Sequence, residues 1–99
     1  MPYMIRTYDK PDAAALRAAT RAAHLDYLRP FTSRLLAAGG FLEDDGSVGR
    51  GGMILFDTDD RAEAQALIDN DPFTRAGVFE RVEVLRWRKV FFDGRDLSA

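Results

Sequence analysis

The chain has 99 residues, of which 46% are hydrophobic and 30% are charged, with 14 Lys and Arg against 16 Asp and Glu. These proportions exclude a disordered or collagen-like chain, the length fits a single domain over residues 1–99, and no apolar run reaches the roughly 18 residues of a membrane span. A net charge of -2 with scattered basic residues argues against nucleic acid as a partner, and zero cysteines exclude disulfides, a thiol nucleophile and thiolate zinc sites.

The N-terminal part of the chain predicts a strand followed by a turn. Residues Tyr3 to Tyr8 alternate large and mixed side chains, Pro11 prevents further strand pairing, and Asp12 is a candidate helix cap. The start Met1-Pro2-Tyr3 lacks the charged and then apolar layout of a signal peptide. We therefore expect a cytoplasmic protein whose first element is a strand.

A long helix is predicted from Ala13 to about Ala38. This stretch is rich in Ala, Leu and Arg, which are good helix formers, and Gly39-Gly40 at its end is typical of a left-handed C-terminal residue. Pro30 lies inside the stretch, lacks a backbone N–H and clashes with the preceding turn, at a cost of roughly 3 kcal/mol or more. We expect a kink or a break near Pro30.

The middle of the chain predicts a hairpin. Phe41-Leu42 begins a short strand, and the segment Asp44-Asp45-Gly46-Ser47 is rich in turn residues. Residues Gly51 to Phe56 then form a nearly continuous apolar run, which is typical of a buried strand. These two strands are expected to pair with each other.

A second helix is predicted after the hairpin. Asp60 with Glu63 has the spacing of a capping pair. The helix must end near Asn70-Asp71-Pro72, because a residue before proline is pushed out of the helical region. Its apolar stripe, which should face the core, consists of Ala64, Leu67 and Ile68.

The last predicted strand runs from Val78 to about Trp87. Its alternation puts Val82 and Val84 on one face of the strand and Leu85 and Trp87 on the other. Both faces of this strand therefore carry bulky apolar side chains, and both need to be covered.

The order strand, helix, strand, strand, helix, strand is that of the ferredoxin-like βαββαβ unit. In this α+β fold, two helices cover one face of a four-stranded antiparallel sheet. The other face would expose roughly several hundred Å² of apolar surface, which is unusual for a stable monomer. We expect a homodimer in which two sheets pack together, and a short polar tail over about residues 93–99 that frays or reaches the partner.

His24 is the single histidine of the chain. His24, Leu28, Phe31 and Leu35 follow helical spacing and share one side of the predicted helix, which turns His24 toward the sheet. Asp71 is a candidate partner, because it follows the second helix and precedes a proline that stiffens the loop. The alternatives are a half-buried histidine that bonds a backbone carbonyl, and a loop carboxylate that accepts backbone N–H bonds.

Motifs along most of the chain match a known family. In chain order they are Arg17, Arg21-Ala22-Ala23-His24-Leu25-Asp26-Tyr27-Leu28, Ala38-Gly39-Gly40, Asp44-Asp45-Gly46, Gly51-Gly52 and Asn70-Asp71-Pro72-Phe73-Thr74-Arg75-Ala76-Gly77-Val78-Phe79. Through them the chain from Tyr3 to Trp87 resembles the YciI-like (YCII-related) family. It departs from the commoner pattern at Ala22, where a proline often stands, and at Pro30 inside the helix.

The resemblance implies a fold and an active site. Members of the family are dimeric α+β barrels of the ferredoxin-like type, and their proposed active site is a His-Asp pair in a pocket, which His24 and Asp71 match here. The family is related in fold to muconolactone isomerases and includes a dehydrochlorinase of chlorinated hydroxyquinols. The resemblance thus implies the chemistry of a lyase or isomerase: cofactor-independent proton transfer, as isomerisation or as elimination such as dehydrohalogenation, on a small oxygenated substrate.

The residue types suit that chemistry. Free imidazole titrates near roughly pH 6.5, and a carboxylate on one ring nitrogen fixes the tautomer, so the other nitrogen can act as base and then as acid. Arg17 and Arg21 lie one turn apart and could bind a substrate carboxylate or enolate, or be solvated helix charges. Phe73 and Trp87 could wall an aromatic pocket, or serve core or dimer packing alone.

Two other functions stay open. The pocket could bind a small metabolite in a non-catalytic dimer, or His24 could be the axial ligand of haem, although no second feature supports haem. The acidic pairs Asp44-Asp45 and Asp59-Asp60 are explained by a turn and a helix cap, so we expect no metal and no cofactor. The expected partners are a small-molecule substrate and a second copy of the chain, with neither nucleic acid nor membrane.

Overall fold

A computed structural model describes all residues, 1–99, and confirms the α+β fold with an antiparallel sheet. Four strands form the main sheet in the order β2-β3-β1-β4, and every neighbouring pair is antiparallel. The elements in chain order are β1 (Tyr3–Asp9), α1 (Ala14–Leu28), the 3-10 helix η1 (Arg29–Arg34), β2 (Leu35–Leu42), β3 (Val48–Phe56), α2 (Arg61–Asp69), α3 (Pro72–Ala76), β4 (Phe79–Arg86), β5 (Phe91–Phe92) and β6 (Arg95–Asp96).

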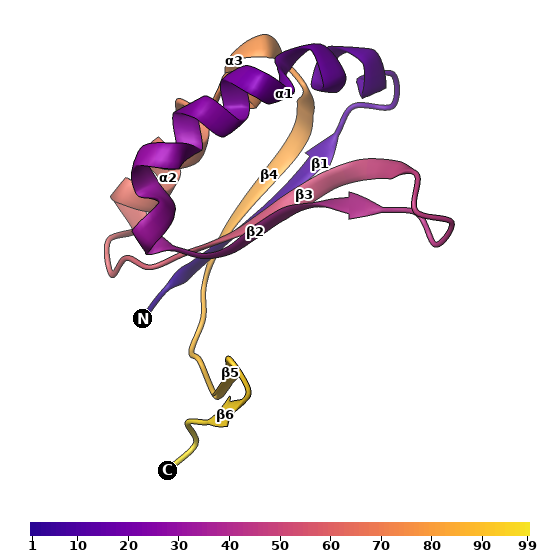
Figure 1. Cartoon of the computed structure of the whole chain (residues 1–99). Helices are drawn as coiled ribbons and strands as arrows, with labels where there is room; N and C mark the ends of the chain where they lie inside the picture. The colour runs from indigo at the N-terminus through magenta and orange to yellow at the C-terminus, as the bar shows by residue number, and fades with distance from the viewer.

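The helices cover one face of the sheet, and the core lies between the two layers (Figure 1). The central strand β1 buries every second side chain, and its Ile5 pairs in register with Ile54 of β3 and Val84 of β4. Because strand side chains alternate between faces, these three residues point together toward the helices. The buried cluster consists of Tyr3, Ile5, Leu28, Ile54, Phe56, Ala64, Leu67, Ile68 and Val84.

The first helix is shorter than predicted. It ends at Leu28, the 3-10 helix η1 follows from Arg29 with Pro30 as its second residue, and strand β2 already starts at Leu35, where it pairs with Phe56. The break near Pro30 is as expected, but the prediction of helix up to Ala38 is wrong. Propensity for helix is a weak preference, and the apolar segment after η1 gains more by pairing with β3.

Three local predictions around the first helix are corrected as a result. Gly39-Gly40 lies inside strand β2 and does not end a helix. Asp12 does not cap α1, because the N-terminal cap position is Ala13 and no side chain bonds the first free N–H groups. Phe31 and Leu35 pack against the core from η1 and β2, so only His24 and Leu28 share a helix face.

The second helix begins where the capping signal predicted. The Asp60 carboxylate accepts a hydrogen bond from the Ala62 backbone N–H at 2.9 Å, which stabilises the start of α2. Glu63 does not complete a capping box, since its carboxylate bonds Thr58 and Arg34 instead. The predicted stripe is confirmed, because Ala64, Leu67 and Ile68 are all buried.

The short helix α3 was not expected. Its five residues begin at Pro72, which suits the first helical position because it has no N–H to leave unpaired. The helix ends at Gly77, whose φ of 86° lies in the left-handed region that favours glycine. This helix packs against α1 and so fixes the residue before it, Asp71, beside the first helix.

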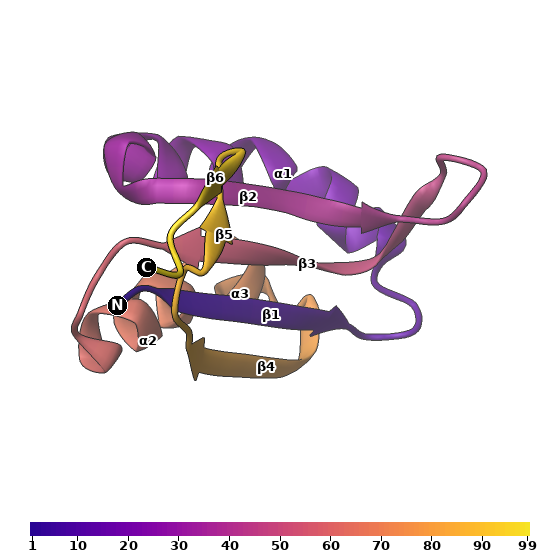
Figure 2. The same ribbon diagram turned by 90° about the horizontal axis from the view of Figure 1, so that it is seen from below.

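The other face of the sheet has no helix over it (Figure 2). Leu85 on this face is 46% exposed, in keeping with the predicted alternation of β4. Residues 93–96 of the predicted tail belong to the hairpin β5–β6, which spans residues 91–96 and whose turn at Asp93-Gly94 has positive φ at both residues. Phe91 of this hairpin is 73% exposed. None of the helices is both long enough and apolar enough to span a membrane.

Candidate active site

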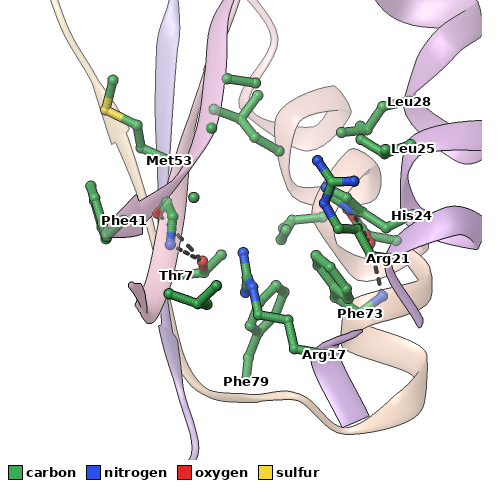
Figure 3. Close-up of a pocket in the computed structure, with 18 of the residues that line it drawn as sticks. Thr7, Arg17, Arg21, His24, Leu25, Leu28, Phe41, Met53, Phe73 and Phe79 are labelled. Carbon is green, nitrogen blue, oxygen red and sulfur yellow. Dashed lines mark hydrogen bonds and ion pairs between the residues drawn. The ribbon is translucent and has the colours of Figure 1, made fainter. Parts of the chain in front are cut away.

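A cavity of about 610 Å³ lies between helix α1 and the β2–β3 part of the sheet (Figure 3). Its lining is mostly apolar, as is usual for pockets that hold small organic molecules. Four residues supply all the charged or titratable groups of the lining, and they are Arg17, Arg21, His24 and Asp71.

His24 and Asp71 meet at one wall of this cavity although 47 residues separate them in the chain. The Nδ1 atom of His24 lies 2.8 Å from Asp71 Oδ2 and 2.9 Å from Oδ1, within hydrogen-bonding distance. Asp71 is fully buried, and 17% of the His24 side chain is exposed. The structure therefore pairs a buried carboxylate with an imidazole that borders the cavity.

The Asp71 carboxylate is itself held in place. It accepts a 2.8 Å hydrogen bond from the Phe73 backbone N–H, as the cap of α3, in addition to the bond from His24. The backbone N–H bond that we weighed as an alternative role for Asp71 thus exists together with the His24 contact. A carboxylate accepts hydrogen bonds and does not donate them, so Nδ1 of His24 is the donor in this contact, and in the neutral form of this imidazole Nε2 has a free lone pair.

Phe73 fixes the plane of the imidazole. Its ring stacks on the His24 ring, with 4.0 Å between the ring centroids and 17° between the planes. Only 2% of Phe73 is exposed, and Phe79 meets it edge to face at 5.9 Å. Phe73 therefore lines the cavity as the sequence suggested, and it also restricts the orientation of His24.

Arg17 is not a solvated helix charge. Its Nη1 donates to both carboxylate oxygens of Asp9 at 3.0 Å, and the side-chain exposures of the two partners are 15% and 4%. The Arg17 guanidinium also lies 4.6 Å from the centroid of the Phe73 ring, a cation–π distance. Arg17 thus links strand β1 to the aromatic ring beneath the imidazole.

Arg21 differs from Arg17 in having no partner. It lines the same cavity from the same helix face, but it forms no hydrogen bond, ion pair or cation–π contact within the chain, and its side chain is exposed. In Figure 3 its guanidinium extends from α1 into the open space. The cavity therefore contains one positive charge, that of Arg21, which no acidic side chain of the chain neutralises.

Trp87 lies outside the cavity, which corrects its predicted role as a pocket wall. It follows the end of β4, its backbone N–H bonds the carbonyl of Pro2, and its ring lies 6.4 Å from that of Phe92 in the C-terminal hairpin. The physical reason is strand alternation, because Trp87 belongs with Leu85 to the face that points away from the helices.

Three residues of the site were missed at first. Asp9 was read as part of a turn, although the alternation of Tyr3, Ile5, Thr7 and Asp9 points it toward the helices, where all four are buried. Gly40 faces the cavity, and a Cβ atom placed there would lie 3.3 Å from Arg17 Nη2.

Tyr27 is the third missed residue. It donates a 2.8 Å hydrogen bond to the Leu67 carbonyl, and burial together with the negative charge of Asp71 raises the pKa of its phenol. Its sequence signals were its place three residues after His24 and its position within the family motif from Arg21 to Leu28. Its phenol therefore senses the charge of the buried carboxylate.

The strands near the cavity floor approach each other closely. Gly51 has φ of 117°, and a Cβ there would collide with the carbonyl oxygen of Thr7. The Thr7 hydroxyl accepts a bond from the Gly52 N–H at 3.0 Å and donates to the Gly52 carbonyl at 3.3 Å. Glycine at position 51 lets β3 approach the backbone of β1, and glycine at position 52 lets it approach the Gly39 carbonyl of β2. No three histidine or carboxylate side chains of the chain converge as a metal site.

Comparison with known proteins gives consistent matches. The family description "YCII-related domain" matches residues 1–88. Protein YciI from Escherichia coli O6:H1 and protein YciI from Shigella flexneri are each 37% identical over 98 residues, which covers 92% of this chain and 100% of theirs.

A solved structure is also similar. It is 5-chloro-2-hydroxyhydroquinone dehydrochlorinase from Burkholderia phenoliruptrix AC1100 in complex with 2,5-dihydroxybenzoquinone. The TM-score is 0.81 at 31% identity, and the match covers 89% of this chain and 94% of the other. The fold expected from the sequence is therefore that of a known enzyme that acts on a small molecule.

Proposed function

Since the chain belongs to the YCII-related family, we propose that it is a small-molecule enzyme in which His24 and Asp71 carry out cofactor-independent proton transfer. The observation that carries this proposal is the 2.8 Å contact between His24 Nδ1 and the fully buried Asp71 carboxylate, beside a mostly apolar cavity. An imidazole anchored in this way has one nitrogen free to move protons. The similar dehydrochlorinase supports a substrate that is a small oxygenated ring.

The proposed reaction uses the free Nε2 of His24 as a base. Nε2 removes a proton from the substrate, and the imidazolium that forms is stabilised by the Asp71 carboxylate on Nδ1. In an isomerisation the same nitrogen returns the proton to another atom of the substrate. In an elimination the electron pair of the broken bond to hydrogen forms a double bond, and the leaving group departs as an anion.

The cavity lining fits the binding part of this proposal. Phe73 presents an aromatic surface next to the imidazole, and Arg17 and Arg21 supply positive charge that favours an enolate or another developing oxyanion.

The same proposal includes a homodimer formed through the uncovered face of the sheet. Leu85 is exposed on that face, and the hairpin β5–β6 projects on the same side with Phe91 exposed (Figure 2). A second copy of the chain would cover these apolar side chains. The exposure of Leu85 and Phe91 on this side of the sheet is the observation that supports a dimer.

The proposed function is tested by a turnover screen of lactones and halogenated hydroxyquinols with the wild-type protein, His24→Gln and Asp71→Asn. We expect the wild type to convert at least one compound, His24→Gln to be inactive, and Asp71→Asn to be slower because the imidazole can then adopt the wrong tautomer. Asp69→Asn is the matched control, since Asp69 is exposed and bonds only Gln65. Binding without turnover in the wild type would favour a non-catalytic protein that binds metabolites.

A further inference from the structure

Three side chains that line the cavity are positively charged or can be protonated. Two of them have an acidic partner, and one has none. Arg17 is compensated by Asp9 at 3.0 Å, and His24 in its protonated form is compensated by Asp71 at 2.8 Å. Arg21 has no acidic partner. A ligand that binds between these groups therefore meets a single uncompensated positive charge.

The two arginines also differ in freedom of movement. The Arg17 guanidinium is held by Asp9 and lies over the Phe73 ring, so its position is set by strand β1 and helix α3 before any ligand arrives. Arg21 has no such contacts, and all its N–H donors are available to a ligand. Since the charge of Arg17 is already balanced, adding an anion next to it gains less than adding one next to Arg21.

We infer that Arg21 is the anion receptor of the cavity, and that the ligand is a planar ring carrying one anionic oxygen group, a carboxylate or a phenolate. Arg17 is in contrast a positioning residue, which holds Phe73 and through it the plane of His24. This inference rests on the proposed function for the location of the site, and it adds the charge of the substrate and the residue that recognises it.

The inferred arrangement orients the substrate. Arg21 precedes His24 by three residues on α1, so the two side chains lie on neighbouring parts of one helix face. The planar fork of a guanidinium binds the two oxygens of a carboxylate in parallel and binds a single phenolate oxygen less completely. An anionic group on Arg21 would place the rest of the ring next to His24 and Phe73.

The test compares the affinity of matched charged and neutral probes by NMR titration. The probes are benzoate against benzamide, and 4-nitrophenolate against 4-nitroaniline, and none of them is a substrate for the proposed reaction. We expect the wild type to bind at least one anion about tenfold more tightly than its neutral partner. Preference within the first pair indicates a carboxylate ligand, and preference within the second pair alone indicates a phenolate.

The variants separate the roles of the two arginines. In Arg21→Gln the preference for the anion should fall to about twofold or less while the neutral probe still binds, and Arg21→Lys should retain part of the preference. In Arg17→Gln combined with Asp9→Asn, which avoids a buried unpaired carboxylate, the preference should remain while both probes bind more weakly. The melting temperature of Arg21→Gln should match that of the wild type, because Arg21 makes no contact within the chain.

Three results would overturn the inference: equal affinity of the wild type for both members of each pair, an unchanged preference in Arg21→Gln, or loss of the preference in the Arg17 and Asp9 double variant. Failure of the proposed function gives a different result. If His24 is not the catalytic base, turnover survives in His24→Gln, while the ratio of the affinities for the charged and the neutral probe remains as expected for the wild type.

Discussion

The ring of Phe73 stacks on the ring of His24 with 4.0 Å between centroids and 17° between planes, while the backbone N–H of Phe73 bonds the carboxylate that holds the imidazole. One residue therefore restrains both members of the His24 and Asp71 pair. This arrangement follows from the short helix α3, which begins with Asp71 as its cap and buries Phe73 in its first turn.

Replacing Phe73 by Leu should distinguish its effect on the orientation of the His24 ring from its effect on core packing. We expect Phe73→Leu to lower the free energy of unfolding by about 1–3 kcal/mol and to lower kcat by about tenfold, because the imidazole loses the surface that fixes its plane. Denaturant unfolding and steady-state kinetics measure the two effects. Phe31→Leu is the control, since Phe31 packs against the core without lining the cavity and should change stability but not kcat.

Tyr27 should report the charge of Asp71. Burial is the larger cause of its raised pKa and the charge of Asp71 the next. The hydrogen bond to Glu83 raises the pKa of Tyr8 as well, so an ultraviolet difference titration should show two tyrosines above the ordinary value of 10.0, of which one is lost in Tyr27→Phe. Asp71→Asn should lower the pKa of Tyr27. A titration that is the same in wild type and Asp71→Asn would contradict the electrostatic contact.

The sign of the effect of Tyr27 on stability follows from the same shift. A raised pKa means that the folded state holds the phenol proton more tightly than the unfolded state. The contribution to stability is thus complete below the unfolded value near pH 10 and is lost as pH rises through the folded pKa. The free energy of unfolding of the wild type should fall more steeply than that of Tyr27→Phe above this pH.

Gly40 should control the size of the cavity. A Cβ at this position would lie 3.3 Å from Arg17 Nη2, so in Gly40→Val the guanidinium must shift by a few tenths of an ångström, and the added methyl groups occupy space needed by a ligand. We expect KM to rise about tenfold or more. Ala37→Val is the control, because Ala37 is an exposed residue of the same strand outside the cavity lining, and an equal rise in KM there would contradict the assignment.

The uncovered face of the sheet should form the dimer interface. Light scattering at micromolar concentration should give twice the chain mass of 11.1 kDa for the wild type and the chain mass itself for Leu85→Glu. Leu16→Glu is the matched control, since Leu16 is 40% exposed but lies on helix α1. A monomeric wild type, or a monomer produced only by Leu16→Glu, would show that the interface is misplaced.

The sequence predicted the parts of the fold that depend on strong local signals. The alternation of Val82, Val84 and Leu85 predicted the two faces of β4, and Asp60 predicted the start of α2. The contact of His24 with Asp71 was expected from the family resemblance, because no spacing rule joins residues on a helix and a distant loop.

Other features could not be read locally because tertiary pairing decides them. Residues 35–38 have good helix formers but become strand, since β3 offers them a pairing partner after the break at Pro30. The ion pair of Asp9 with Arg17 joins β1 to α1. No local sequence pattern around either residue predicts that the two make contact. The alternation already placed Trp87 with Leu85, but the structure was needed to show that the cavity lies on the opposite face of the sheet.

The most direct test of the proposed function measures the turnover number of His24→Gln for whichever compound the wild type converts. The matched control is Asp26→Asn, which alters an exposed residue on the same helix that bonds only Arg29. We predict that kcat of His24→Gln falls by about 100-fold or more while Asp26→Asn stays within about twofold of the wild type, with both variants folded. Turnover by His24→Gln at the wild-type rate would contradict the assignment of His24 as the proton-transfer residue.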